Sequence, residues 1–551
     1  MLGPPKTRDL DRPVLISLES AVPKDHFYRH LHRLLDLSFV RDLAADCYAA
    51  GGRPSIDPEV YFRLQLIMFF ERIPSERKLL EQARYNLAMR WYAGYNLDEP
   101  LPDHSSLSKI RARLGLLVFR RFFETITAQC IQADLVWGEE LIFDATKVRA
   151  NASMDSLIPR LRLLTEEHLA SLEPAEPPTT LWETNDARWD LLEACRLDPD
   201  RPASDGYERK SDRLVSTTDP DAVPMKTTGQ KTTLGFHDHY IKDGGKARII
   251  LNALVTPADV MENTPMLPLL RRAMFRWRVK PKRVIADTIY GTAENVRELE
   301  ESRIRAYVPL PDWDQRTPYY GASLFTYDAE HDVYGCPQGA TLRHYTTEHT
   351  PRKIVRYRAD ATVCNACPVK ADCTASMHGR QIARSFDADY LDQVRAYHET
   401  EAYKKAMRKR KVWIEPLFGE AKQWHGMRQF RLRGLQKVNM EGLFIAAGQN
   451  LKRLLSAKGW GRHPLAGWSG RIRCDPPANP HHAGLKCDVP TVLRTSIGDS
   501  RLRPPKPRRW LPTFSPGRDI PTGSLTMHRS DPLPEIGSYH AYLEQLQCRI
   551  C

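Results

Sequence analysis

Two short apolar runs, each followed directly by an aspartate, constrain the fold of this chain most strongly. Asp144 follows the run 141–143, and Asp287 follows the run 284–286. Short apolar runs bounded by polar residues are typical of buried strands. Burying a charge at the end of such a strand is costly unless the charge is paired or bound to a metal ion. The pattern predicts two strands that end at a site, although either aspartate alone could be an ordinary strand-end or capping residue.

A third carboxylate, Glu415, opens a basic helical stretch further along the chain. Lys422 follows seven residues later, about two helical turns, so it should lie on nearly the same face. Glu420 is the rival acid, and we interpret it as a solvated residue on the helix surface. Pro416 suits the first turn of a helix, which predicts that the helical region 388–456 is split near this proline.

Three acids from separate elements could converge on one point and hold a pair of divalent metal ions. In such sites the two ions lie about 3.5–4 Å apart and contact the oxygens of a phosphodiester. Mg²⁺ prefers carboxylate, water and phosphate oxygens, so a few protein ligands are enough. The sequence thus predicts a site for Mg²⁺, or Mn²⁺, at Asp144, Asp287 and Glu415.

The pattern of apolar residues divides the chain into three parts. Apolar residues at three- and four-residue spacing predict helices throughout 1–136. Strand and helix patterns alternate over 137–456, which indicates an α/β region with a helical insertion at 153–210 and a cysteine-rich insertion at 330–375. The remainder, 457–551, is rich in proline and basic residues, and it is expected to be disordered or extended.

Four of the eleven cysteines lie in the predicted cysteine-rich insertion. They are Cys336, Cys364, Cys367 and Cys373. The Cys-x2-Cys pair has the spacing of a zinc knuckle, and the other two could complete a tetrahedral site. Four thiolates would leave no open position, so the predicted Zn²⁺ is structural and the insertion is expected to be zinc-ribbon-like. The alternative is four unligated thiols in a reducing cytosol.

The balance of charge favours a polyanionic partner. The formal net charge is +13 and the pI is about 9.1, which is typical of proteins that bind nucleic acid, although solubility alone could explain it. The apolar run 61–70 is short and contains Arg63 and Gln65, so no membrane span is expected. The N-terminus lacks the apolar stretch of a secretion signal. A cytoplasmic, nucleoid-associated protein is therefore expected.

Two basic segments, 404–413 and 425–434, are interleaved with aromatic residues. Cationic side chains bind phosphates, and aromatic rings can stack on exposed bases. The candidate DNA-binding residues are Arg408, Lys411, Lys422, Trp424, Arg428, Arg431 and Arg433. For any one of these residues the alternative is a solvated helix face or, for the aromatic residue, packing in the core.

A further basic helix is predicted in the N-terminal part. Ser105 or Ser106 is expected to cap it. Its cations Lys109, Arg111 and Arg113 could contact DNA if the helix belongs to a helix-turn-helix-like unit.

Three motifs carry a resemblance to a known family. Asp144 is followed by Ala-Asn-Ala-Ser at 150–153, and Asp287 stands in the pattern Ala-Asp-x2-Tyr-Gly. Glu415 and Lys422 match the Glu-x6-Lys half of a Tyr-x2-Arg-x3-Glu-x6-Lys signature. With these motifs the chain resembles the DDE transposases of bacterial insertion sequences, and most closely the branch usually numbered eleven eighty-two. The stretches 52–60, 75–97, 101–115 and 215–222 also resemble this branch, so the likeness covers roughly residues 10–456.

The resemblance implies a fold and an activity. It implies an RNase H-like catalytic core, a mixed sheet flanked by helices, which uses Mg²⁺ on insertion-sequence DNA. Such a protein would cleave double-stranded DNA at the element ends and transfer the 3′-OH to a target, and paired ends make a homodimer the expected state. The chain departs from the signature at Arg408, where tyrosine is expected, and at Lys411, where arginine is expected.

Two other functions stay open at this point. A decayed or domesticated nuclease would hydrolyse DNA with the same carboxylates but would not transfer strands. A zinc-containing DNA-binding regulator would use the carboxylates only as structural residues. Metal-dependent nicking distinguishes the regulator from the other two.

Overall fold

The computed structural model describes most of the chain up to residue 460. It describes residues 11–460 apart from 12, 49–50, 52–54, 160–213, 227–228, 230, 313, 315–316 and 350–352. The helical insertion predicted at 153–210 therefore lies almost entirely outside the described residues, as does nearly all of the predicted tail 457–551. Within the described ranges, no helix is both long and apolar enough to cross a lipid bilayer.

The N-terminal part is helical, as predicted. Its α-helices are α1 (Leu18–Ala21), α2 (Phe27–Leu34), α3 (Phe39–Ala44), α4 (Pro58–Phe70), α5 (Glu76–Tyr85), α6 (Leu87–Ala93) and α7 (His104–Gln132). Pro58 occupies the first turn of α4, where its missing N–H costs nothing. The cap of α7 was wrongly predicted, because Asp103, and not a serine, accepts the hydrogen bond from Ser105 N. An aspartate caps a helix N-terminus as well as serine does.

A mixed six-stranded sheet forms the centre of the described part of the chain. Its strands are β1 (Glu140–Arg149), β4 (Val223–Met225), β5 (Thr233–Asp243), β6 (Ile250–Pro257), β7 (Arg283–Ile285) and β8 (Arg305–Tyr307). The order is β4-β5-β1-β7-β8, and β6 also pairs with β5. β1 runs antiparallel to β5 and parallel to β7, so it has an antiparallel neighbour on one side and a parallel neighbour on the other. The predicted α/β architecture is therefore confirmed.

One detail of the predicted strands is wrong. Asp144 does not end its strand, because β1 continues to Arg149, paired with β5 from Asp243 to Gly235. Pairing with β5 continues after Asp144, although pairing with β7 stops at Ile142, so the strand carries polar residues past Asp144 without ending. Asp287, by contrast, lies just beyond β7, where its side chain accepts from Ile289 N at 3.0 Å.

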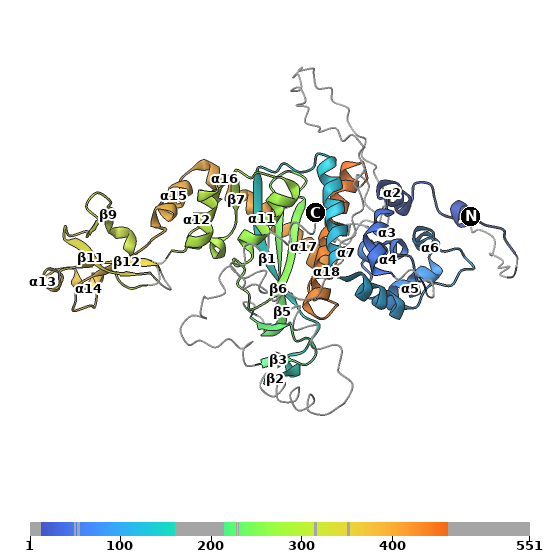
Figure 1. Ribbon diagram of the computed structural model, residues 1–551, viewed down its shortest axis with the longest axis horizontal. Coiled ribbons are helices and arrows are strands. Elements are labelled where there is room, and N and C mark those ends of the chain that lie inside the picture. Colours follow the sequence, from blue (N-terminus) through green and yellow to red (C-terminus); the bar gives the residue numbers. More distant parts are fainter. Residues whose placement is uncertain are drawn as a thin grey trace, which may run out of the picture. The chain divides into compact units, whose positions relative to one another are not determined.

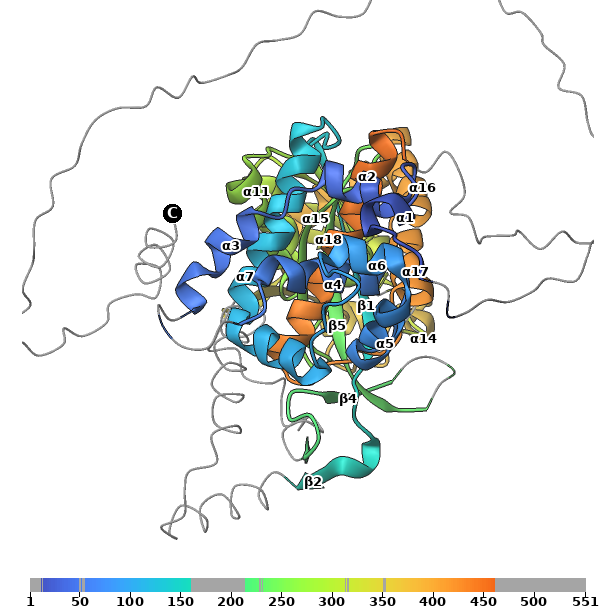
Figure 2. The same cartoon turned by 90° about the vertical axis from the view of Figure 1, so that its right-hand side faces the viewer.

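Helices pack around this sheet. They are α11 (Met266–Trp277), α12 (Ala293–Glu301), α15 (Ala388–His398), α16 (Glu401–Trp413), α17 (Glu415–Trp424) and α18 (Leu435–Ala457). α16 packs against β7 and β8, and α18 packs against β6 and α7 (Figure 1). The predicted split of the basic helical region is confirmed, since α16 ends one residue before Ile414 and α17 begins one residue after it. The N-terminal helices gather beside α7 and α18 (Figure 2).

α18 covers the outer edge of β6 with two buried asparagines. The amide of Asn450 accepts from Ile250 N and donates to Ile250 O, both at 2.8 Å. Asn439 makes the same pair of bonds with Val255, at 2.9 and 2.8 Å. An uncovered edge strand would present unpaired N–H and C=O groups. These two amides satisfy part of that edge inside the core.

The N-terminus of α18 is capped from elsewhere in the chain. Gly434 N donates to the carboxylate of Asp219 at 3.1 Å, and Leu435 N donates to that of Asp221 at 2.7 Å. Helix N-termini carry unpaired N–H groups and a partial positive charge, so carboxylates are stabilising there. The segment before β4 thereby fixes where α18 begins.

The cysteine-rich region forms a second, five-stranded sheet within the described residues. Its elements are β9 (Thr326–Asp328), β10 (Val333–Gly335), β11 (Thr341–Glu348), β12 (Ile354–Ala359), β13 (Gln381–Ser385) and the short helices α13 (Ala361–Asn365) and α14 (Lys370–Cys373). The sheet extends ten residues beyond the predicted end at 375 and has a small core of its own. A separate two-stranded sheet pairs β2 (Leu157–Pro159) with β3 (Leu214–Ser216).

Candidate active site

The pairing of β1 with β7 brings Asp144 and Asp287 together. The register pairs Ile142 with Ile285, and each aspartate lies two residues further along its segment. Arg410 of α16 contacts both: its Nη2 lies 3.0 Å from Asp144 Oδ1 and 3.4 Å from Asp287 Oδ2. One nitrogen atom therefore lies within ion-pair distance of two carboxylates from neighbouring strand segments.

Burial and charge both act on Asp144. The pKa of this carboxyl is raised to about 6, chiefly by burial and also by the negative charge of Asp287, against the opposing effect of Arg410. Desolvation disfavours the charged form, as does a like charge nearby. Any cation that lies beside Asp144 therefore stabilises the charged form of this carboxyl.

Glu262 is a neighbour that the sequence did not reveal. It follows β6 in the loop that leads to α11, and its side chain is 17% exposed. Burial raises the pKa of Glu262 to about 6, and the charges of Asp287 and Asp144 raise it as well. The Nε2 of His237 lies 3.8 Å from its carboxylate. No motif marks this loop acid, and only the fold brings it beside the two aspartates.

Glu415 occupies the first turn of α17, and it is exposed. Among the described residues, no group of three or more His, Cys, Asp or Glu side chains is arranged to hold a metal ion. Glu415 therefore does not complete a three-carboxylate site with Asp144 and Asp287 in this structure. The structure brings together two of the three predicted acids.

The packing of α17 places its other polar residues. Phe418 stacks on Tyr240 with ring centroids 4.6 Å apart, and Tyr240 is the β5 partner of Asp144. Lys422 is half-buried, and burial lowers its pKa while the charges of Asp238 and Asp144 raise it. Lys422 thus lies close enough to Asp144 for the charge of this aspartate to affect its pKa.

Glu420 is not the solvated residue that we predicted. Its carboxylate pairs with Arg453 at 2.9 Å and with Lys452, and it is only 18% exposed. Burial raises the pKa of Glu420, but its bond with His425 and the two cations hold the value far below the usual range. Glu420 is therefore held by two cations of α18.

The predicted DNA-binding residues differ in exposure and in their contacts. Arg408, Lys411, Arg428 and Arg433 are exposed. Arg433 Nε nevertheless donates to Asn151 O at 2.9 Å, and half-buried Arg431 pairs with Glu76 at 3.4 Å.

Two further residues that were predicted to bind DNA, Trp424 and Arg111, contribute to the protein's own packing. Trp424 stacks under the guanidinium of Arg72, 4.0 Å from its ring centroid. Arg111 is 8% exposed and pairs with Glu76, so the prediction that it contacts DNA is wrong. An arginine at an apolar helix face can be buried when a partner carboxylate neutralises it.

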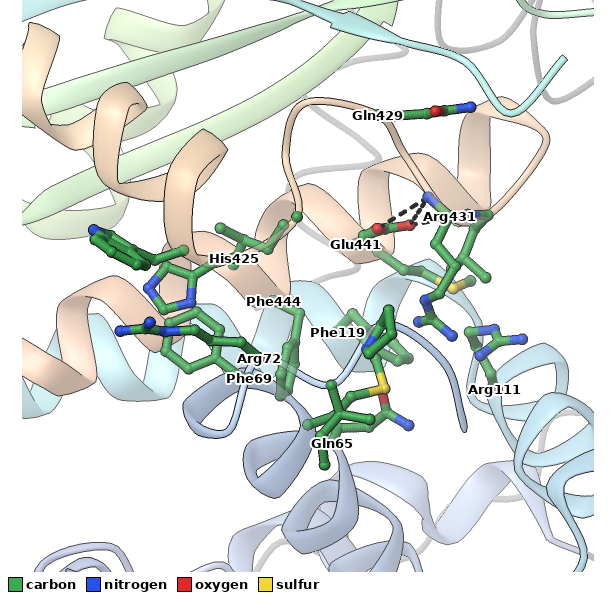
Figure 3. Close-up of a pocket in the computed structure, with 18 of the residues that line it drawn as sticks. Gln65, Phe69, Arg72, Arg111, Phe119, His425, Gln429, Arg431, Glu441 and Phe444 are labelled. Carbon is green, nitrogen blue, oxygen red and sulfur yellow. Dashed lines mark hydrogen bonds between the residues drawn. The ribbon is translucent and has the colours of Figure 1, made fainter. Parts of the chain in front are cut away.

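A cavity of about 260 Å³ lies where α4 and α7 meet α17 and α18 (Figure 3). Phe69 and His425 stack on its wall with centroids 3.9 Å apart, and the carboxylate of Glu441 accepts from Arg431 N at 3.1 Å. None of the three predicted catalytic acids lines this cavity. It belongs to the packing between the N-terminal helices and the last two helices.

The four predicted zinc ligands line one cavity of about 220 Å³. Cys336 Sγ accepts from Ala340 N at 3.2 Å, and Cys364 Sγ accepts from Arg380 N at 3.5 Å. Burial raises the pKa of Cys373, and the other three thiols raise it further. The cysteines are close neighbours, but within the described part of the chain they are not in metal-binding geometry.

Comparison with known families identifies two matching segments. Residues 16–113 match the family model described as Transposase domain (DUF772). Residues 335–455 match the family model described as Transposase DDE domain, and this segment contains Glu415, Lys422 and the four cysteines. Asp144 and Asp287 lie outside both segments. A search of curated proteins finds no match.

Proposed function

We propose that this chain, which carries two transposase domains, cleaves DNA phosphodiesters at the ends of an insertion sequence and joins the 3′-OH ends to target DNA. One observation carries the proposal: Asp144 and Asp287 approach a single nitrogen of Arg410 from adjacent strand segments. Carboxylates from rigid neighbouring elements are what metal-assisted phosphoryl transfer needs.

The chemistry of the donor set fits a divalent cation. Two carboxylates that reach one nitrogen atom can also reach one small cation, and carboxylate oxygens suit Mg²⁺ or Mn²⁺. Asp144 and Asp287 would hold one of two ions, and the pair of ions would activate the attacking oxygen and stabilise the leaving oxygen. We propose Glu415 as the third ligand. Its exposed position at the start of α17 leaves it open to an incoming substrate.

We further propose an RNase H-like core and double-stranded DNA as the partner. The central position of β1, with antiparallel strands on one side and parallel strands on the other, supports this fold. Exposed cations on α16 and just after α17 support the DNA contact, and half-buried Lys422 would grip a phosphate near Glu415. Paired element ends favour a homodimer, and the motifs favour the branch numbered eleven eighty-two.

A structural Zn²⁺ at Cys336, Cys364, Cys367 and Cys373 is part of this proposal. The four thiols line one cavity, and two of their sulfurs already accept backbone N–H bonds. Zn²⁺ would require the sulfurs to close in from their present positions to about 2.3 Å from the ion.

The catalytic proposal is tested with single substitutions. We expect Asp144→Asn, Asp287→Asn and Glu415→Gln each to abolish Mg²⁺-dependent cleavage of element-end DNA while end binding is retained. Glu401→Gln, at an exposed acid in the first turn of α16, is the matched control and should cleave normally. Full cleavage by any of the three variants would remove that residue from the site.

The two other functions give different results in the same assays. A nuclease would cleave but would fail to join pre-nicked ends to target DNA. A DNA-binding regulator would bind the ends without nicking them in Mg²⁺ or Mn²⁺.

A further inference from the structure

We infer that Arg410 is an internal cation that competes with the divalent metal ion for Asp144 and Asp287. This inference rests on the proposed function, because it takes the two aspartates as metal ligands. Arg410 would have to leave the carboxylates before the ion binds, so it would set the metal concentration at which the protein becomes active. Arg410 lies in the basic segment 404–413, but it stands at an unspecified position of the signature, so no motif gives it a role.

The contacts of Arg410 place it where the ion would lie. Its Nη2 is 3.0 Å from Asp144 Oδ1 and 3.4 Å from Asp287 Oδ2, so it lies between the two carboxylates. The positive charge of the guanidinium offsets their mutual repulsion. A metal ion bound by both carboxylates would need the same space and would supply the same kind of compensation.

The rest of the guanidinium is poorly held. The side chain of Arg410 is 16% exposed, and its Nε is buried without a hydrogen-bond partner in the described part of the chain. A buried donor without a partner costs free energy. The attraction of the two carboxylates must offset this cost, and the cost is relieved when the side chain moves away.

A divalent ion is suited to displace this group. Mg²⁺ carries twice the charge and approaches carboxylate oxygens to about 2.0–2.1 Å, which is closer than a guanidinium nitrogen can come. Displacement nevertheless lowers the apparent affinity for the ion, because only the fraction of molecules with open carboxylates can bind it. Removing Arg410 should therefore tighten metal binding.

Arg410 lies close to the junction of α16 and α17. It lies in the last turn of α16, and its backbone carbonyl accepts from Ile414 N, the residue at which α16 and α17 separate. A phosphate brought beside Glu415 by DNA would offer the displaced guanidinium a new anionic partner.

The test measures Mn²⁺ binding to the full-length protein without DNA, using the electron paramagnetic resonance signal of free Mn²⁺. We expect Arg410→Gln and Arg410→Met to bind Mn²⁺ roughly tenfold more tightly than the natural protein. Lys405→Ala is the control, because it removes a cation from an exposed position of the same helix. It should leave the affinity unchanged. Thermal melting of each variant checks that it is folded.

The outcomes separate this inference from the proposed function. Equal or weaker Mn²⁺ binding by both Arg410 variants would overturn the inference, while loss of binding in Asp144→Asn would still support the metal site. If Asp144→Asn and Asp287→Asn bind Mn²⁺ as the natural protein does, the proposed site and this inference both fail. Tighter binding that Asp144→Asn abolishes in the Arg410→Gln background supports both.

Discussion

Glu262 and Glu415 are two acids that differ in how they relate to the aspartate pair. Glu262 is half-buried and lies within the field of Asp144 and Asp287, whereas Glu415 is exposed at the start of α17. A carboxylate close to the metal ligands can orient water or substrate without being a ligand itself.

We expect Glu262→Gln to lower the cleavage rate by about ten- to a hundredfold, in the range seen when a group beside the metal ligands is changed. Glu415→Gln should abolish cleavage. Single-turnover cleavage of element-end DNA in Mg²⁺ measures both variants. If the Glu262 variant is inactive and the Glu415 variant is fully active, the third acid has been assigned to the wrong residue.

Asp219 gives the stability of the fold a dependence on pH. The pKa of Asp219 is raised to about 7, chiefly by burial and also by the charge of the nearby Asp221. Because this folded-state pKa lies above the unfolded value, its contribution to stability is complete below about pH 4 and is lost as pH rises towards 7. Asp219→Asn keeps an oxygen for Gly434 N but cannot be charged.

We expect the melting temperature of Asp219→Asn, relative to that of the natural protein, to rise between pH 5 and pH 8. Thermal unfolding at both pH values measures this difference. Asp46→Asn, at an exposed aspartate, is the control and should show no such change. A pH-independent difference for Asp219→Asn would contradict the assignment.

The aspartate pair could be predicted from sequence, but its immediate partners could not. Apolar runs before Asp144 and Asp287 indicated strands, and a family motif marked both residues. Arg410 and Glu262 meet them only through the packing of α16 and the loop after β6. No local pattern encodes contacts between segments so far apart in the chain.

At the scale of elements, the contact between α18 and β6 depends on amides in an otherwise apolar interface. Asn450 has no exposed surface, and its side chain satisfies both backbone groups of Ile250. A helical periodicity predicted α18, but the sequence did not indicate that its asparagines would replace a missing strand. The break between α16 and α17 was predictable because Pro416 acts locally.

We expect Asn450→Leu to lower the free energy of unfolding by about 2–3 kcal/mol, since two buried backbone groups lose their partners. Urea unfolding followed by circular dichroism measures the change. Asn96→Leu, at an exposed position, should change it by less than about 0.5 kcal/mol. A small effect for Asn450→Leu would mean that water or a neighbouring side chain replaces the amide.

At the scale of the molecule, the cysteine-rich sheet depends little on the main core. Its own core consists of the buried residues Phe325, Tyr334, Leu342, Tyr357, Ala359 and Ile382. A core this small rarely stabilises a sheet without a disulfide or a metal ion. The cysteine spacing predicted the position of this region, but not its extent, because β13 pairs with β12 from beyond the last cysteine.

We expect purified protein to contain about one Zn²⁺ per chain by mass spectrometry of the metal. Cys364→Ser should lose the metal and should increase proteolysis within the second sheet, while the main sheet stays protected. Cys47→Ser, at a cysteine outside the cavity, is the control. Protein that is free of zinc but resists proteolysis would refute the structural ion.

The contacts within the chain divide it into two units, Met1–Gly470 and Arg471–Cys551. We expect a protein truncated after Gly470 to keep the melting temperature of the full chain, because the first unit contains every helix and strand described above. A protein that ends before Asn450 should not fold. Differential scanning calorimetry compares the two, and a large loss of stability on truncation after Gly470 would contradict the division.

The two amide contacts between α18 and β6 also determine when the protein can finish folding during its synthesis. Asn439 and Asn450 follow their β6 partners by 184 and 200 residues. At about 5–20 residues per second, the ribosome needs on the order of 10–40 s to make that stretch. Until then β6 has an uncovered edge that a nascent chain on the same messenger could pair with, so fast translation or a chaperone at this stage would protect the yield of native protein.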